Sequence, residues 1–456
     1  MHKDTTDNLS TLADELAVIF QEIVEEAVPV AQQEETELRE LEQVVQGTMN
    51  RVGRRFLELL VEVSRSEEEP APVPCRCGGT AMFERHREGT VMTTMGQIRV
   101  KRAYYLCPKC HRGTYPLDER LGFCAGGLSA ALQDALALIG VHLPFEMASE
   151  LFERLTQVSI SDNGVRESTE RLGQERMDAE EELVEAAWYM DRFELPEGPE
   201  EVPDRLYGSI DGTTVRTEEG WREAKLGSWY TTGKRVESET PDEWELHGEA
   251  IEYYGDIQEA EDFGRLVYLT GRQRGAHEAE ELVFVADGAK WIWNVVDEHF
   301  PEAVQIVDWY HATEYIWKVA HAAYGEGTEK AKEWAAARQD ELWHGDFADV
   351  LQAFQAHASP AWDDDPARQA INYFRNNRDR MRYPHFRAQR YQIGSGTIES
   401  GCKRVIGARL KQAGMTWTVK GARRVIKSRA MYLSGEWDEF CARRPPPQRT
   451  YSRCVA

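Results

Sequence analysis

The chain has 456 residues, of which 41% are hydrophobic and 10% aromatic, and its formal net charge is −25. This composition is that of a globular protein, and the length is enough for roughly two or three domains with hydrophobic cores. No segment approaches the roughly 18 consecutive apolar residues of a membrane span, and the N-terminal segment lacks the basic region and cleavage pattern of a secretory signal. We therefore expect a cytoplasmic protein without a membrane segment.

Residues 1–70 are rich in Glu and Gln and predict one or two amphipathic helices. We expect them to pack on the rest of the chain or on a partner chain. The prolines of "EEEPAPVPC" then mark a linker, because proline cannot continue a helix. The apolar residues at helical spacing are Leu38, Leu41, Val45, Met49, Val52, Phe56 and Leu60.

Four of the eight cysteines form two close pairs, Cys75 with Cys77 and Cys107 with Cys110. In a reducing compartment such pairs favour a metal over disulfides. About one β-hairpin of chain separates the pairs, so residues 71–122 predict a zinc-ribbon-like module in which four thiolates hold Zn²⁺. His86 or His111 could replace one thiolate, and free cysteines are the alternative.

Residues 123–195 have apolar residues three and four positions apart and predict a helical domain. Ser161 or Asp162 is placed to cap a short second helix. A helix-turn-helix and a plain helical hairpin both fit this pattern.

From residue 200 onward, three apolar strand-like segments each carry an aspartate at or near their end: Asp211, Asp287 and Asp308. In α/β folds the carboxyl ends of buried strands hold reactive side chains rigidly while leaving them accessible. A single aspartate there could equally be a helix N-cap.

Glu399 follows Gly394-Ser395-Gly396 at the start of a predicted helix, where backbone N–H groups attract phosphate oxygens. Two strand-end aspartates and this glutamate would repel one another unless divalent cations lay between them. Oxygen ligands favour Mg²⁺ or Mn²⁺. Two such ions can activate a water or a 3′-hydroxyl and stabilise the leaving oxygen of a phosphodiester.

A basic segment surrounds Glu399. Residues 375–429 contain 15 Lys or Arg and two acids, a net charge of +13 in an otherwise acidic chain. This contrast favours contact with a polyanion, although Lys and Arg also commonly solvate helix faces. The candidate DNA contacts are Lys403, Arg404, Arg409, Lys411, Arg423 and Arg424.

The motifs "SIDGTTV", "FVADGAKWIW", "VDWYHA" and "GSGTIESGCKRVIGARLK" resemble those of DDE transposases of prokaryotic insertion sequences, the Kra-type family related to Mutator-like elements. The resemblance implies an RNase H-like catalytic core over residues 200–435 with an all-helical insertion at about 312–390. It also implies Asp211, Asp287 and Glu399 as the metal-binding triad, with Asp308 and His311 as auxiliary residues. Residues 436–456 are left as a tail.

The expected protein is therefore an α/β DNA transposase with Mg²⁺ (or Mn²⁺) and Zn²⁺ as cofactors. Its partners would be the terminal inverted repeats of its own element and target DNA, bound as a homo-oligomer in the cytoplasm, associated with the nucleoid. Two other functions fit the sequence: a domesticated zinc-containing DNA-binding protein without cleavage, and an RNase H-like nuclease or junction resolvase.

Overall fold

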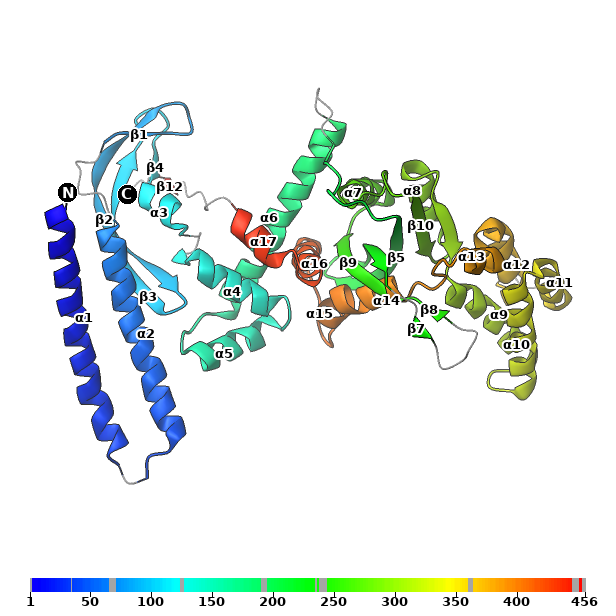
Figure 1. Ribbon diagram of the computed structural model, residues 1–456, viewed down its shortest axis with the longest axis horizontal. Helices are drawn as coiled ribbons and strands as arrows, with labels where there is room; N and C mark the ends of the chain where they lie inside the picture. The colour runs from blue at the N-terminus through cyan, green and yellow to red at the C-terminus, as the bar shows by residue number, and fades with distance from the viewer. Residues whose placement is uncertain are drawn as a thin grey trace. The chain divides into compact units, whose positions relative to one another are not determined.

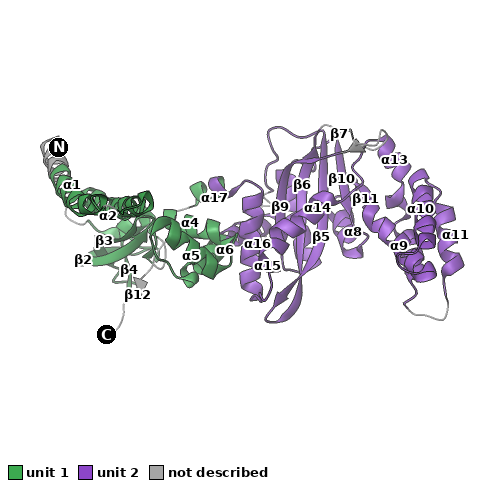
Figure 2. Cartoon of the chain, turned by 90° about the horizontal axis from the view of Figure 1, so that it is seen from below, with its two compact units in different colours: residues 1–172, 439–456 green, residues 173–438 purple. Residues whose placement is uncertain are grey.

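The computed structural model describes residues 2–33, 35–64, 71–123, 127–189, 195–233, 236–237, 244–359, 364–444 and 451–452. It divides into two compact units (Figure 2). Unit 1 comprises residues 1–172 and 439–456, and unit 2 comprises residues 173–438. Within the described part of the chain, none of the helices is long and apolar enough to cross a membrane. The chain is a mixed α/β protein, as predicted.

Unit 1 begins with an antiparallel helical hairpin of α1 (His2–Ala31) and α2 (Leu38–Val63), seen in blue in Figure 1. Two interhelical ion pairs of 2.6 Å, Glu26–Arg51 and Glu15–Arg55, fix the register between the helices. The N-terminal region is therefore two helices rather than one.

The hairpin packs through α2 on a small antiparallel sheet. Leu57 and Val61 of α2 cover a core that includes Val91, Ile98 and Val100. The sheet has the order β1-β2-β3-β4-β12. Its strands are β1 (Val73–Pro74), β2 (Thr80–Thr93), β3 (Gly96–Leu106), β4 (Arg112–Thr114) and β12 (Tyr451–Ser452).

The C-terminal residues that we expected to form a tail contribute structure of their own. They contain α17 (Trp437–Arg443), and β12 pairs antiparallel with β4 through Tyr451 and Gly113. A two-residue strand has too little pattern to be recognised in a sequence.

A group of helices follows the sheet in unit 1. Ser161 caps α6 because its Oγ accepts a hydrogen bond from the N–H of Gly164 (3.1 Å). This helix is 27 residues long and not the short one we predicted, and the boundary between the units falls inside it. The helices are α3 (Pro116–Leu121), α4 (Ala130–Gly140), α5 (Phe145–Thr156) and α6 (Asp162–Trp188).

Unit 2 is built on a five-stranded sheet of order β11-β10-β5-β6-β9. Strands β5, β6 and β9 form an antiparallel meander, whereas β10 and β11 run parallel to β5. The run "ELVFVA" of β10 is buried at four successive residues, as expected for a strand covered on both faces. The strands are β5 (Arg205–Thr217), β6 (Gly220–Thr232), β9 (Gly248–Asp256), β10 (Glu281–Ala286) and β11 (Val304–Val307). A separate two-stranded ribbon pairs β7 (Val236–Glu237) with β8 (Trp244–Glu245).

Helices pack on this sheet and extend beyond it. Near the sheet, α16 packs on β9, and α14 packs on β5 and β6. Between β11 and α14, helices are the only regular secondary structure of the described residues. This is the region in which the sequence predicted a helical insertion. Near the sheet are α7 (Ala260–Gln273), α8 (Lys290–His299), α14 (Gly396–Gly401), the π-helix η3 (Cys402–Gly407), α15 (Ala408–Leu410) and α16 (Val419–Leu433). Beyond β11 come α9 (Trp309–Tyr324), α10 (Glu329–His344), α11 (Phe347–His357), α12 (Pro366–Asn376), the 3₁₀ helix η2 (Arg378–Met381) and α13 (Tyr383–Ala388).

Candidate functional site

Four cysteine sulfurs of unit 1 lie together and form what we call the cysteine cluster: Cys75, Cys77, Cys107 and Cys110. All four Sγ atoms lie within 4.8 Å of one another. The closest pairs, Cys75–Cys110 and Cys77–Cys107, are each 3.6 Å apart. Four thiolates bound tetrahedrally to Zn²⁺ at about 2.3 Å have sulfurs about 3.8 Å apart. The cluster could therefore hold a metal such as zinc, with sulfur ligands only.

Tight backbone turns bring these sulfurs together. In the first turn the N–H of Cys75 bonds to the Gly79 carbonyl (2.8 Å), and Gly78 adopts a positive φ of 74°. In the second turn the N–H of Cys107 bonds to the Arg112 carbonyl (3.0 Å). Backbone N–H groups of Cys110 and Lys109 lower the pKa of Cys107 to about 7, whereas at Cys110 the backbone N–H of Arg112, which lowers the pKa, is outweighed by burial and by hydrogen bonds with the other thiols, which raise the pKa to about 11. A lowered pKa favours the thiolate, which is the form that binds metal.

Three acids of unit 2, Asp211, Asp287 and Asp308, form what we call the acidic row. Asp287 and Asp308 directly follow β10 and β11, as predicted, whereas Asp211 lies in the middle of β5 and not near its end, because β5 continues to Thr217 in its pairing with β6. The parallel pairing of β10 with β5 ends at Phe284 and Gly208, three residues before Asp287 and Asp211. The register between β10 and β11 pairs Ala286 with Val307, and one residue further it places Asp308 beside Asp287. Neighbouring strands lie about 4.8 Å apart. Asp287 and Asp308 thus follow the ends of adjacent strands, and Asp211 on β5 is close enough for its charge to act on Asp287.

Asp308 is fully buried, and both oxygens of its carboxylate form hydrogen bonds within the protein. One oxygen accepts from the backbone N–H of Tyr310 (3.0 Å) and so caps α9. The other lies 2.8 Å from Nδ1 of His311 and accepts a hydrogen bond of 2.7 Å from Ser395 Oγ. The bond to Asp308 raises the pKa of His311 to about 9, so this imidazole is protonated at neutral pH.

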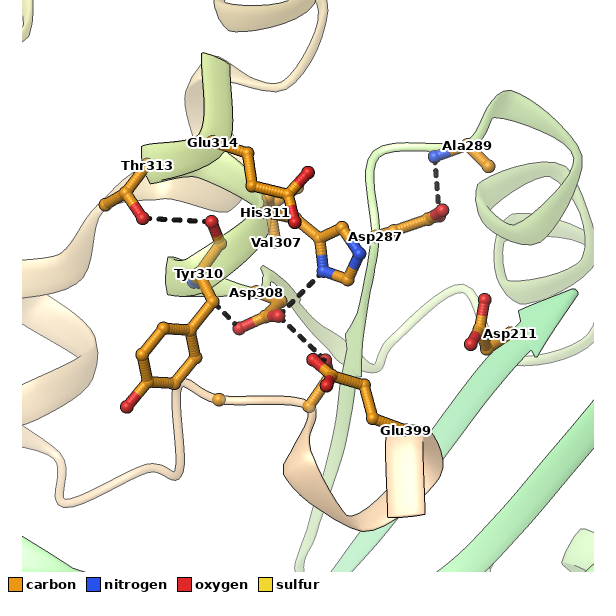
Figure 3. Close-up of polar contacts among 12 residues, drawn as sticks. Asp211, Asp287, Ala289, Val307, Asp308, Tyr310, His311, Thr313, Glu314 and Glu399 are labelled. Carbon is orange, nitrogen blue, oxygen red and sulfur yellow. Dashed lines mark hydrogen bonds and ion pairs between the residues drawn. The ribbon is translucent and has the colours of Figure 1, made fainter. Parts of the chain in front are cut away.

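Glu399 reaches the same place from α14 (Figure 3). Its Oε1 lies 3.4 Å from Ser395 Oγ, and its other oxygen lies 3.9 Å from Nζ of Lys403. Ligand atoms of Asp308, His311 and Glu399 all lie within 4.8 Å of one another. The tightest grouping of possible ligands thus joins Glu399 to the two auxiliary residues, and Asp211 and Asp287 lie outside it.

Asp287 and Asp211 stand across from this group (Figure 3). Oδ1 of Asp287 accepts from the N–H of Ala289 (2.8 Å). Burial raises the pKa of Asp287, and the negative charges of Asp211 and Asp308 raise it further. A Cβ added at Gly288 would lie 2.0 Å from the Tyr373 ring, so this position requires glycine.

The acidic row and Glu399 together form what we call the carboxylate site. Its oxygen donors fit a hard divalent cation such as Mg²⁺ or Mn²⁺. The pKa of Asp287 is raised mainly by burial and also by the charges of Asp211 and Asp308, so its negative charge is unfavourable in this position. Among the described residues of unit 2, the possible ligand atoms that lie within 4.8 Å of one another belong to Asp308, His311 and Glu399, so a cation held by Asp211, Asp287 and Glu399 would require these three side chains to approach one another.

The basic segment divides into an interior part and an exposed part. Arg409 is fully buried and lies over the Trp417 ring, and Arg423 forms a 2.6 Å ion pair with Asp256. Arg424 donates to Gln174 (2.9 Å). These three predicted DNA contacts therefore support the fold of unit 2.

The other three predicted contacts, Lys403, Arg404 and Lys411, are exposed, and Lys403 and Lys411 lie near the carboxylate site. Lys403 is close to Glu399, as described above, and Lys411 donates from Nζ to Thr213, two residues from Asp211. Their positions suit contact with a phosphate backbone beside the acids.

Sequence reasoning missed three residues that shape the carboxylate site. Ser395 bridges Asp308 and Glu399 through its hydroxyl. Cys402 donates from Sγ to Oδ2 of Asp211 (3.4 Å), and Tyr373 packs against Gly288. The Gly-Ser-Gly turn did indicate a special position for Ser395, although we interpreted it as a backbone phosphate site. Nothing in the local sequence distinguishes Cys402 or Tyr373.

Residues 31–193 match the model of an uncharacterised protein family, UPF0236. The match contains the cysteine cluster and ends before the first strand of the carboxylate site. No curated protein matches the chain.

Proposed function

We propose that the protein is a DNA transposase whose unit 2 is an RNase H-like core that cleaves and transfers DNA strands with the help of divalent metal ions. Three antiparallel strands followed by two parallel ones support this fold. The observation that carries the proposal is the carboxylate site itself, in which Glu399, from a helix far along the chain, lies beside Asp308 and faces Asp287 and Asp211 of the neighbouring strands (Figure 3).

Asp211, Asp287 and Glu399 would hold Mg²⁺ or Mn²⁺. The metal would supply an activated water or 3′-hydroxyl and charge stabilisation of the leaving oxygen. Glu399 is accessible to a ligand, since about 37% of its side chain is exposed. Asp308 has no exposed surface and already bonds to Tyr310, His311 and Ser395, so it positions Ser395 beside Glu399 rather than binding metal.

Cations around the site would hold the DNA. The imidazole of His311, whose pKa is raised to about 9, and the exposed side chains of Lys403 and Lys411 place positive charge next to the acids. Such charge attracts phosphates without reading sequence. The DNA backbone would thus be held against the carboxylates that bind the metal.

The cysteine cluster would hold one structural Zn²⁺ in unit 1. Four sulfur ligands close a tetrahedral site and leave no position for a substrate, which is the usual arrangement of structural zinc. Unit 1, with this zinc ribbon and its helices, would recognise the ends of the element, and target DNA would enter at the carboxylate site.

The experiment is a strand-transfer assay on a labelled duplex made from the DNA that flanks the gene. The purified chain with Mg²⁺ or Mn²⁺ should cut at the ends of flanking inverted repeats and join the 3′ ends to a plasmid. Cleavage without joining would indicate a nuclease or junction resolvase. Sequence-specific binding without cleavage in either metal would indicate a domesticated DNA-binding protein.

A further inference from the structure

The α1–α2 hairpin carries an unusually apolar exposed face. Among the described residues of its two helices, ten large apolar side chains are at least 38% exposed, and all but Val18 and Leu38 belong to one set, whose eight members are each 38% to 56% exposed. They recur at intervals of three, four or seven residues, which is the spacing of a coiled-coil seam. We call this set the apolar stripe: Phe20, Val24 and Val28 on α1, and Val45, Met49, Phe56, Leu60 and Val63 on α2.

Both halves of the apolar stripe face the same side of the hairpin. Ile23 of α1 is buried, and α2 is the helix that packs on α1. Thr48 of α2 is buried too and lies seven residues before Arg55, on the face that pairs with Glu15 of α1.

Val24 directly follows Ile23, and Met49 directly follows Thr48. One residue along an α-helix turns the side chain by about 100°, so Val24 and Met49 each point about 100° away from the contact between the helices. Because the helices are antiparallel, equal rotations in the same sense point both side chains to the same side. The stripe is therefore one continuous two-helix face.

The area of this face is large enough for a stable dimer. Apolar side chains have full surfaces of roughly 150–200 Å², so the apolar stripe exposes about 600 Å² on one copy. That is the upper limit for the largest apolar patch of a typical monomer, about 600 Å². Two copies would bury about 1,200 Å² from the stripe alone, which reaches the lower bound of a specific interface.

The charges beside the apolar stripe favour a protein partner over a membrane. Asp14, Glu25 and Glu42 are exposed beside or within it. Helices that lie on an anionic membrane carry Lys and Arg on their polar edges instead. A two-helix apolar face with heptad spacing matches half of a four-helix bundle, and a closed two-fold dimer lets the same surface complete itself.

We propose that the apolar stripe is a dimer interface, on which the α1–α2 hairpin of a second copy of this chain packs to complete a four-helix bundle. The dimer forms without DNA. It places two copies of the chain together before either meets an element end, and it is independent of the chemistry proposed for unit 2.

The test is the mass of the full-length chain in solution, measured by light scattering after size exclusion and by sedimentation. Wild type should be a dimer. Val24→Glu combined with Met49→Glu should be a monomer, with a dissociation constant raised at least ~100-fold, because each buried carboxylate lacks a partner. Glutamate is a good helix former, so circular dichroism should show unchanged helix content.

Leu155→Glu is the matched control, since Leu155 is 66% exposed on α5 of the same unit. It should leave the dimer intact. Salt should tighten the dimer, because acids of the two copies face one another and salt screens their repulsion.

A monomeric wild type at high protein and salt concentration would overturn the proposal. So would a dimer that survives Val24→Glu with Met49→Glu, or one that Leu155→Glu dissociates. Binding of a monomeric wild type to phosphatidylcholine–phosphatidylglycerol vesicles, lost in the double variant, would assign the stripe to lipid instead.

Discussion

The cysteine cluster of unit 1 and the carboxylate site of unit 2 are assembled in different ways. The cysteines come from two short turns at the ends of neighbouring strands, and their four sulfurs already lie within 4.8 Å of one another. The carboxylates come from residues 211, 287, 308 and 399, and the two predicted ligands Asp211 and Asp287 stand outside the tightest group. The first site is closed by local backbone geometry, whereas the second depends on the whole sheet.

The two sites are assembled differently because their ligands differ in charge and because the proposed metals differ in role. Thiols can approach one another as neutral groups, so turns can bring them together before a metal binds. Ionised carboxylates repel one another and are costly to bury, and the pKa of Asp287 is raised by burial first and by the charges of Asp211 and Asp308 second. A closed set of ligands suits a structural metal, and an open set leaves room for a substrate.

The largest effect should come from breaking the cysteine cluster. The chain should carry about one Zn²⁺ and Cys107→Ser should lose it, because the site needs all four thiolates. Unit 1 should then unfold at lower denaturant concentration, since structural zinc contributes several kcal/mol to folding. Metal analysis and a denaturation curve provide the measurements. Cys441→Ser, which lies outside the cluster, is the control. Wild type without metal after purification would contradict the assignment.

The second prediction concerns Asp287 and Asp308, neighbours in the acidic row with different roles. Asp287→Asn should abolish DNA cleavage, a loss of about 10³-fold or more, because it removes a metal ligand. Asp308→Asn should reduce cleavage less, because Asp308 acts through Ser395 and His311.

DNA binding, measured in parallel, should persist in both variants. Asp340→Asn, on the surface of α10, should change nothing. Full activity of Asp287→Asn beside an inactive Asp308→Asn would reverse the two roles.

A third prediction concerns Asp256, a buried acid that forms ion pairs with Arg423 and Lys427 of the same chain and therefore needs no metal ion. Burial alone would raise its pKa, but Lys427 and Arg423 outweigh burial and lower it. Asp256→Asn should destabilise unit 2 by about 3 kcal/mol at pH 7, because it leaves Lys427 buried with less counter-charge.

The pH dependence has a definite sign. The pKa of Asp256 is lower in the folded state, so its contribution is fully present above about pH 4 and is lost as the pH falls through the folded-state pKa. Urea unfolding curves at pH 7 and pH 3 should therefore show a smaller difference between wild type and Asp256→Asn at pH 3. An equal difference at both values would contradict the account.

The smallest effect is expected from the exposed cations. Neutralising Lys403 and Lys411 together should weaken DNA binding several-fold for all sequences alike. The slope of the logarithm of the binding constant against the logarithm of the salt concentration should become shallower by about 2, one for each lost phosphate contact. Arg375→Gln, elsewhere in the basic segment, is the control for a general loss of charge. Binding that is unchanged at every salt concentration would show that the two lysines only solvate the surface.

Local features of the fold and the sites could be predicted from the sequence, and features that depend on distant packing could not. The cysteine pairs and their turn glycine are adjacent in the sequence, so their grouping follows from turn geometry. Asp287 follows an apolar run, which correctly indicated a strand end, whereas Asp211 lies in the middle of β5, because the polar residues after it still pair with β6. Arg409 could not be separated from Lys403, because its burial depends on Trp417 and the surrounding helices.

The bridge from Ser395 to Asp308 spans 87 residues, and no local pattern encodes it. The length of α6 was also missed, because its polar and apolar residues are weakly segregated and its far end is stabilised by packing in unit 2. There Glu180 pairs with Lys427 of α16.

The most direct test of the carboxylate site is Mn²⁺ binding to the full chain, followed by electron paramagnetic resonance. Wild type should bind Mn²⁺ more tightly in the presence of DNA, whose phosphates complete the coordination. Asp211→Asn, Asp287→Asn and Glu399→Gln should each abolish that binding, whereas Asp308→Asn should retain it. Equal Mn²⁺ binding by wild type and all three ligand variants would contradict the claim that these carboxylates form the metal site.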